Sequence, residues 1–577
     1  MKWLPPWLTG YRREWLAGDL TAGLIVTVML IPQSLAYAML AGLPPQIGLY
    51  ASIVPILAYA ALGTSMTLAV GPVAVISLMS ASALAPLASP GSDQFIALSI
   101  QLALLSGLML LAFGVLRLGF LANFLSHPVI SGFISGSAIL IAVGQLRHLL
   151  GVKAAGDGIP GLLASLATAL PQTNGVTLSI GLVSLLFLWA ARRWLAGTLT
   201  AIGMPRKMAD LLARLAPMLA VIVSTLTVWL LQLDERAGVA VVGAVPSGLP
   251  VLQWPGFDVS MLGALLLPAL LLSLVGFVES VSVAQSLALK RRERIVPNRE
   301  LLGLGAANVA SALSGAYPVT GGFARSVVNF AAGAVTPLAG VISALLMALV
   351  VMGLTGLFYY LPHAVLAATI IIAVTSLIDV QTLKEAWAYD RADALALIAT
   401  ALGVLLLGVE AGILLGVGLS LGVLVWRSSR PHVAVVGRIP GTEHFRNVQR
   451  HQVQTVPGLL AVRIDENLFF GNAAMVESVL ESHLATDPSI RRLVLSFAGV
   501  NQVDSTALGV LTQLEQTLAE RGIRLELAEV KGPVMDRLRH TELGVHIKDR
   551  IHLSLHEAFV SAGDGTAVPS EAAKPRN

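Results

Sequence analysis

Long apolar stretches follow one another almost without interruption from residue 20 to residue 426. A bilayer core about 30 Å thick requires roughly 20 apolar residues in a helix. About fourteen stretches are candidates, several of them too short to span the core alone. They are residues 20–40, 46–62, 73–88, 94–114, 124–150, 174–191, 215–232, 260–287, 300–314, 325–333, 335–354, 362–379, 392–408 and 410–426. The sequence therefore predicts a mostly α-helical membrane protein with about 14 transmembrane segments.

The composition agrees with a membrane protein and excludes several kinds of chemistry. Hydrophobic residues make up 55% of the chain and charged residues 12%, against about 25% charged residues in an ordinary soluble domain. The chain has no cysteine, which excludes disulfides, thiol nucleophiles and cysteine-bound metals. The net charge of +4 does not require a nucleic-acid partner, because Lys and Arg gather on the cytoplasmic loops of membrane proteins. We expect no enzymatic activity, cofactor, metal or nucleic-acid partner.

Basic residues give the orientation of the predicted segments. Lys and Arg cluster before the first segment, after the sixth (192–214) and after the eighth (290–299), whereas residues 234–255, after the seventh, carry only Arg236. Cytoplasmic loops hold the excess of positive charge. An even number of segments then places both termini in the cytoplasm.

Two segments have an irregular pattern that would be costly in lipid. Residues 67–77 read TLAVGPVAVIS and residues 317–329 read YPVTGGFARSVVN, each a short extended run, a Gly-Pro or Gly-Gly pair, and then a helix start. Such backbone is tolerated at membrane depth only where protein or a water-filled cavity satisfies it. Matching interrupted segments in two halves of a chain indicate inverted repeats with a substrate site between them.

The starts of these two half-helices, at Val73 and at Ala324–Arg325, are the candidate anion site. Helix N-termini offer backbone N–H groups and positive dipole ends to an anion. Arg325 adds a cation, which inside a membrane protein faces a cavity or a partner. The alternatives are two ordinary broken helices, and an arginine paired with Glu279.

Glu279 is the acidic residue of the otherwise apolar run from 265 to 289, and Gly276, Ser282 and Ser286 share its helical face. An isolated intramembrane carboxylate is a candidate site for a coupling proton or cation. A fixed salt bridge to Arg325 is the alternative role.

Gln33 and Tyr37 lie four residues apart, next to Pro32 in the first segment. A neutral amide can donate to an anion without bringing a competing charge. A hydrogen bond between helices is the alternative for these side chains.

Ordinary globular charge density returns after Arg430. We divide the chain into a transmembrane domain (1–430), a small α/β domain (431–560) and a disordered tail (561–577). The α/β prediction rests on strands at 459–464, 492–497 and 523–528, which alternate with helices at 473–485, 505–520 and 533–542. The turn at 503–507 joins a strand to a helix, so Asp504 or Ser505 is an N-cap or Ser505 is a regulatory site.

Several stretches together resemble the SulP sulfate permease family, which includes animal anion exchangers related to pendrin and the motor protein prestin. They are IPQSLAYAMLAGLPPQIGLYAS at 31–52, GPVAVISLM at 71–79, ARSVVNFAAGAVTP at 324–337, LPHAVLAA at 361–368 and VDSTALGVL at 503–511. The last stretch resembles the strand–turn–helix of a STAS domain, which is related to bacterial anti-sigma-factor antagonists. The resemblance covers nearly the whole chain.

The resemblance implies a seven-plus-seven inverted repeat in which a core domain moves against a gate domain, and it implies a homodimer. Gln33 and Tyr37 match the first-helix site residues of the family, Val73 the third-helix position and Arg325 the helix-10 arginine. Ala324 stands where animal members often carry serine, so this position brings no hydroxyl. The position of Ser505 matches a serine that is phosphorylated in the antagonist proteins.

The function implied is secondary active transport of a small anion, with alternating access of the core against the gate. Sulfate is favoured for a bacterial-looking chain, coupled to H+ or Na+ through Glu279, in the lipid of a bacterial inner membrane. Transport of bicarbonate or C4-dicarboxylates by symport or exchange is the alternative. An anion channel and a STAS-based membrane sensor are further alternatives.

Overall fold

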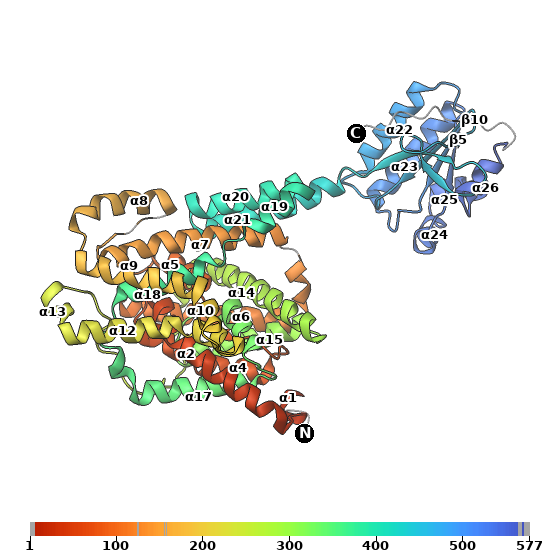
Figure 1. Ribbon diagram of the computed structural model, residues 1–577. Helices are drawn as coiled ribbons and strands as arrows, with labels where there is room; N and C mark the ends of the chain where they lie inside the picture. Colours follow the sequence, from red (N-terminus) through yellow and green to blue (C-terminus); the bar gives the residue numbers. More distant parts are fainter. Residues whose placement is uncertain (1–5, 124–125, 155, 157, 564–567, 570–577) are drawn as a thin grey trace. The chain divides into compact units, whose positions relative to one another are not determined.

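The computed structural model describes residues 6–123, 126–154, 156, 158–563 and 568–569. The chain divides into two compact units, Met1–Ser420 and Leu421–Asn577 (Figure 1). Each unit has its own buried core. Residues 564–567 and 570–577 of the predicted disordered tail lie outside the described residues.

Each predicted apolar segment contains a helix. Among the described residues, eight helical stretches are long and apolar enough to cross a membrane by length and composition. The helices at the predicted positions are α2 (Leu16–Leu40), α3 (Pro45–Tyr50) with α4 (Val54–Leu62), α5 (Ala74–Leu84), α6 (Asp93–Val115), α7 (His127–Leu150), α9 (Gly175–Ala190), α12 (Ala216–Leu231), α14 (Leu262–Arg291), α15 (Pro297–Leu313), α16 (Phe323–Ala331), α17 (Leu338–Gly353), α18 (His363–Thr375), α20 (Arg391–Leu407) and α21 (Val409–Ser428).

The structure differs from the prediction mainly in the connections. The predicted segment 46–62 is two helices, α3 and α4, and short helices that the apolar pattern did not mark lie before the first long helix and between the later ones. These are α1 (Pro6–Thr9), α8 (Gly158–Ala169), α10 (Ala196–Ala201), α11 (Arg206–Arg214), α13 (Leu233–Ala237) and α19 (Val380–Tyr389). A search for bilayer-length apolar runs does not detect helices this short.

The two halves of the membrane unit interlock. α6 packs along α15, α7 along α20 and α2 along α17, and each pair joins the first half to the second (Figure 1). The strands β1 (Val70–Gly71) and β2 (Thr320–Gly321) also pair across the halves. The predicted fold class, an inverted repeat of helices with two half-helices, is confirmed.

The C-terminal unit is an α/β domain, as predicted. Within the described residues, its eight-stranded sheet has the order β10-β5-β3-β6-β7-β8-β9, with β4 paired to β3 and with β6 to β9 parallel. The strands are β3 (Val433–Arg438), β4 (Phe445–Asn447), β5 (Gln454–Thr455), β6 (Leu459–Ile464), β7 (Arg492–Ser496), β8 (Arg524–Ala528), β9 (Ile551–His552) and β10 (Val568–Pro569).

Helices cover both faces of this sheet because successive side chains of a strand point to opposite faces. Leu493 and Leu495 pack on the side of α22 (Ala473–Thr486) and α23 (Ser505–Glu520), whereas Val494 packs toward α26 (Leu555–Val560). The predicted helix 533–542 is instead α24 (Gly532–Leu538) followed by α25 (Glu542–His546). A new helix begins there because the Thr541 hydroxyl accepts a hydrogen bond from the Gly544 N–H at 3.1 Å.

A buried carboxylate joins three strands of the sheet. Glu526 on β8 is 2% exposed, and it accepts two hydrogen bonds from Arg492 on β7, at 2.8 and 2.7 Å. His552 on β9 lies 2.9 Å from the same carboxylate. Burial acts to raise the pKa of Glu526, but the hydrogen bonds and charges of Arg492 and His552 outweigh it and hold the pKa below its ordinary value of 4.5.

Candidate functional site

The two interrupted segments meet as a short antiparallel strand pair. Val70 lies opposite Gly321 and Gly71 lies opposite Thr320. Gly71 has a φ of 150°, a conformation that favours glycine. Because β1 leads into α5 and β2 leads into α16, the pairing brings the starts of the two half-helices together.

Neither half-helix has a side-chain cap at its start. α5 begins after Val73 and α16 begins after Gly322, and the side chain of neither residue accepts a hydrogen bond from an N–H group of the first turn. The first N–H groups of a helix have no acceptor within the helix and carry the positive end of its dipole. The two starts can therefore bind an anion through their backbone.

Arg325, in the first turn of α16, lies buried at this junction with only 3% of its surface exposed. Its Nη1 donates to the carbonyl of Pro72 at 2.6 Å, while Nε and Nη2 have no hydrogen-bond partner among the described residues. Gly71 and Gly322 provide the space, because a Cβ there would lie 3.4 and 3.1 Å from Nη2. A buried guanidinium with unused donors can bind an anion.

Glu279 lies on α14, 7% exposed, and interacts electrostatically with Arg325. Its Oε2 has no hydrogen-bond partner among the described residues. Both Glu279 and Arg325 belong to the described residues, and no ion pair within 4.0 Å joins them. The direct salt bridge considered from the sequence is therefore not formed in this structure. Ser282 and Ser286, which the sequence placed on the same face, are exposed.

Tyr37, 7% exposed on α2, interacts electrostatically with both Arg325 and Glu279. Gln33, one turn earlier, is half-buried. Neither side chain makes a hydrogen bond to a described residue, so the hydrogen bond between helices considered from the sequence is not formed within that part of the chain. Both polar groups are available to a ligand.

Val73 and Ala324 present apolar side chains beside the half-helix starts. Val73 is buried at 8% exposure, and Ala324 is exposed. Any contribution of these two residues to anion binding therefore comes from the backbone N–H groups.

Polar residues that the sequence analysis missed hold the strand pair in place. Ser280 on α14 bonds the Thr320 hydroxyl at 2.8 Å and accepts from the Gly321 N–H at 2.9 Å. Ser326 on α16 accepts from the Ala69 N–H at 2.9 Å. Gly276 and Ser280 are two small residues four apart in an apolar helix. This spacing could have indicated that another segment packs closely against this face of α14.

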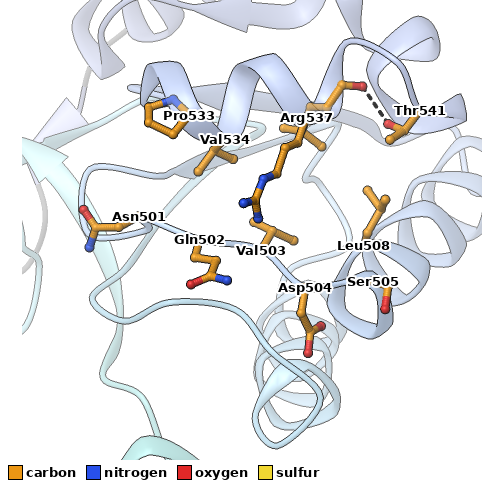
Figure 2. A pocket seen from close by; sticks show the side chains of 11 residues that line it. Asn501, Gln502, Val503, Asp504, Ser505, Leu508, Pro533, Val534, Arg537 and Thr541 are labelled. Atoms are coloured by element: carbon orange, nitrogen blue, oxygen red, sulfur yellow. Dashed lines mark hydrogen bonds between the residues drawn. The ribbon is translucent and has the colours of Figure 1, made fainter. Parts of the chain in front are cut away.

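In the C-terminal unit, Asp504 is the N-cap of α23. Its carboxylate accepts from the Ala507 N–H at 2.8 Å and from the Phe470 N–H at 2.9 Å. Ser505 is exposed beside it and lines a cleft of about 500 Å³ between the start of α23 and α24. Figure 2 shows the Arg537 side chain extending from α24 into this cleft.

Inverted helical halves, uncapped half-helix starts around a buried cation, and a C-terminal α/β domain define a multi-pass membrane transporter. Residues 16–400 match the Sulfate permease family, and residues 450–558 match the STAS domain. The chain belongs to the sulfate permease family; it is an anion transporter and not an enzyme.

Individual relatives agree with this assignment. The chain is 36% identical over 536 residues to sulfate transporter 4.1 of Arabidopsis thaliana, covering 90% of this chain and 76% of the relative. It is 35% identical over 551 residues to a probable sulfate transporter of Mycobacterium tuberculosis, covering 95% of each chain.

Two solved structures share the fold. The murine solute carrier 26 family member A9 anion transporter, in the inward-facing state, has a TM-score of 0.88 at 23% identity, covering 97% of this chain and 94% of that one. The transmembrane domain of the cyanobacterial bicarbonate transporter BicA has a TM-score of 0.59 at 27% identity, covering 71% of this chain and 99% of that one.

Proposed function

We propose that the protein is a secondary active transporter of sulfate, which binds between the starts of α5 and α16. The observation that carries this proposal is Arg325, whose buried guanidinium has two nitrogens without a hydrogen-bond partner among the described residues, between two uncapped helix starts. An anion there would accept from the guanidinium and from backbone N–H groups. Gln33 and Tyr37 supply further neutral polar groups on the α2 side.

Sulfate is favoured by the names of the sequence relatives, which are plant and mycobacterial sulfate transporters. Bicarbonate is the second candidate, because the structure of a bicarbonate transporter shares the fold at 27% identity. Both anions, like a C4-dicarboxylate, carry oxygen atoms that suit N–H donors.

We propose that Glu279 binds the coupling ion, H+ or Na+. Its buried Oε2 has no partner among the described residues, which leaves a place for a proton or a cation. Transport would proceed by alternating access of a core domain, which carries the half-helices, against a gate domain. We also propose that the protein is a homodimer in the bacterial inner membrane, which family membership supports. The basic loops support the placement of both termini in the cytoplasm.

Uptake of radiolabelled anions into proteoliposomes tests this proposal. Sulfate, bicarbonate and C4-dicarboxylates are offered separately, with and without imposed pH and sodium gradients. We expect sulfate to accumulate when one of the two gradients is present. Accumulation of another anion in its place would reassign the substrate, and a current far faster than carrier turnover would indicate a channel.

We further propose that Ser505 belongs to a regulatory site of the STAS domain, because it lies exposed at the rim of a cleft that contains Arg537. Ser505→Asp adds the charge that a phosphate would bring, and Ser482→Asp adds the same charge on an exposed part of α22 outside the cleft. The proposal requires a change in transport rate with Ser505→Asp alone. Equal rates in both variants would contradict it.

A further inference from the structure

Two fully buried carboxylates bind the loops beside the half-helices from the opposite half of the membrane unit. Asp19 lies near the start of α2 and Glu300 near the start of α15, and both are 0% exposed. Their hydrogen-bond donors among the described residues are N–H and O–H groups rather than Lys or Arg. Each of these buried carboxylates is therefore hydrogen-bonded by uncharged donors.

Asp19 holds the loop that follows α16. Oδ1 accepts from the backbone N–H groups of Val335 at 2.7 Å and Thr336 at 2.9 Å. Oδ2 accepts from the Thr336 hydroxyl at 2.6 Å and from the Tyr11 hydroxyl at 3.3 Å. A residue of the first half thus fixes the exit of the half-helix that carries Arg325.

Glu300 holds the loop that leads into β1. Oε1 accepts from the backbone N–H groups of Thr64 at 2.6 Å and Ser65 at 3.0 Å, and also from the Thr64 hydroxyl. Oε2 accepts from the Tyr59 hydroxyl at 2.6 Å. A residue of the second half thus fixes the approach to the other half-helix.

A glycine contact accompanies each carboxylate, and this observation is independent of the hydrogen bonds. A Cβ at Gly18, beside Asp19, would lie 2.5 Å from the carbonyl oxygen of Gly333. A Cβ at Gly303, one turn after Glu300, would lie 2.9 Å from the Cα of Gly63. Real side chains do not tolerate such distances, so each helix can approach its loop closely only because glycine is present.

We propose that Asp19 and Glu300 are positioning residues for the anion site, each acting through the loop that it binds. The proposal rests on the proposed function, because it takes Arg325 and the half-helix starts as the site. Release of residues 64–65 frees β1 and Pro72, and release of 335–336 frees α16, so either change displaces the guanidinium. A guanidinium displaced from the anion loses a hydrogen bond between charged groups, a loss that costs about tenfold or more in affinity.

Asp19→Asn and Glu300→Gln test the proposal in the full-length protein, because each keeps the shape of the side chain and removes its charge. Asp379→Asn is the matched control. Asp379 likewise accepts from a backbone N–H, that of Thr382 at 2.9 Å, and from the same residue's hydroxyl, but it caps α19. Two quantities are measured: the Kd for radiolabelled sulfate, and amide hydrogen exchange in the two loops without added anion.

We expect both test variants to bind sulfate about 10- to 100-fold more weakly, the usual cost of a lost hydrogen bond to a charged group, and to raise the KM of uptake more than they lower its maximal rate. Exchange should accelerate at residues 64–65 in Glu300→Gln and at residues 335–336 in Asp19→Asn. The control should retain the parent's Kd and the parent's exchange in both loops.

Parent-like affinity in the test variants would overturn the positioning role, even with faster exchange. If the parent itself binds no sulfate, the proposed function fails, and hydrogen exchange then tests the structural half of the proposal, that each carboxylate fixes its loop: faster exchange in the matched loop supports it and unchanged exchange overturns it. If a carboxamide variant does not fold, Thr64→Val and Thr336→Val replace it, because each removes one hydroxyl donor to the carboxylate. Each also removes the acceptor of one backbone N–H, that of Val296 at 3.4 Å and that of Leu338 at 3.2 Å. The expected loss of affinity is then smaller but has the same direction.

Discussion

The site combines two buried charges of opposite sign that do not touch. One nitrogen of Arg325 donates a hydrogen bond to the carbonyl of Pro72. Oε2 of Glu279 has no hydrogen-bond partner among the described residues. A buried charge is costly unless a partner compensates it. In the proposed transport cycle, an anion binds at Arg325 and a proton or cation binds at Glu279.

Glu279→Gln separates the coupling role from a purely structural role. The substitution keeps the size of the side chain and removes the exchangeable charge. If Glu279 binds the coupling ion, uptake driven by a pH or sodium gradient should collapse, whereas exchange of anions without a gradient should persist.

Proteoliposome uptake with and without each gradient, for parent and variant, is the measurement. If Glu279 only neutralised Arg325, the variant would instead bind the anion with altered affinity and remain gradient-dependent. Gradient-driven accumulation by Glu279→Gln at the parent level would remove the coupling role.

At the scale of elements, the apolar helices and the two interrupted segments could be predicted because their signals are local. Each is a run of about 20 apolar residues, or a short run broken by Gly-Pro or Gly-Gly. The hydrogen bonds that hold the two interrupted segments in place could not be predicted. The partners of Ser280, Ser326, Asp19 and Glu300 are distant from them in the sequence. A serine or carboxylate in an apolar helix indicates that a partner exists but does not identify it.

Gly322→Ala should weaken anion binding by crowding the guanidinium. The φ of Gly322 is −91°, which alanine adopts without strain, but its Cβ would lie 3.1 Å from Nη2 of Arg325. Gly175→Ala is the control, because a Cβ at this first residue of α9 meets no atom within 4 Å. We expect a rise of about tenfold in the sulfate Kd for Gly322→Ala, as for an arginine displaced from its position, and no change for the control. Equal Kd values would show that the guanidinium adapts.

The sheet of the C-terminal unit should lose stability in acid through Glu526. Because folding lowers the pKa of Glu526, the folded chain binds fewer protons than the unfolded chain, so its contribution is full above pH 4.5 and is lost as the pH falls below that value. Glu526→Gln should be about 1.5–3 kcal/mol less stable at pH 7, the usual cost of a hydrogen bond to a charged group.

Chemical unfolding of a fragment covering residues 431–563, followed by circular dichroism between pH 3 and pH 7, measures this effect. The parent and the variant should converge in stability as the pH falls. A constant difference between them across this range would show that Glu526 contributes through its shape and not through its charge.

At the scale of the whole molecule, the candidate transport residues and the STAS domain belong to separate units with separate cores. The strand pair, Arg325 and Glu279 all lie before residue 420, and the sheet lies after residue 430. Each unit buries its own apolar side chains. The proposed anion site therefore lies wholly within the membrane unit.

Deletion of the chain after Arg430 should leave a membrane unit that folds and binds sulfate with the parent's Kd. All the proposed anion-site residues precede the deletion, although the transport rate can fall if the STAS domain regulates it. Binding of radiolabelled sulfate to the purified truncated protein is the measurement, with size-exclusion chromatography as the control for folding. A folded truncated protein without sulfate binding would show that the STAS domain completes the site.

The most direct test of the account is the sulfate affinity of the full-length protein and of Arg325→Ala. Loss of a hydrogen-bonded charge should cost about 1.5–3 kcal/mol, or about 10- to 150-fold in Kd. Arg192→Ala is the control, because this exposed arginine donates to the carbonyl of Ile372 at 3.0 Å, away from the half-helices. The account predicts that the parent and the control bind sulfate alike and that Arg325→Ala binds it at least about tenfold more weakly. Binding by a folded Arg325→Ala at the parent's affinity would contradict it.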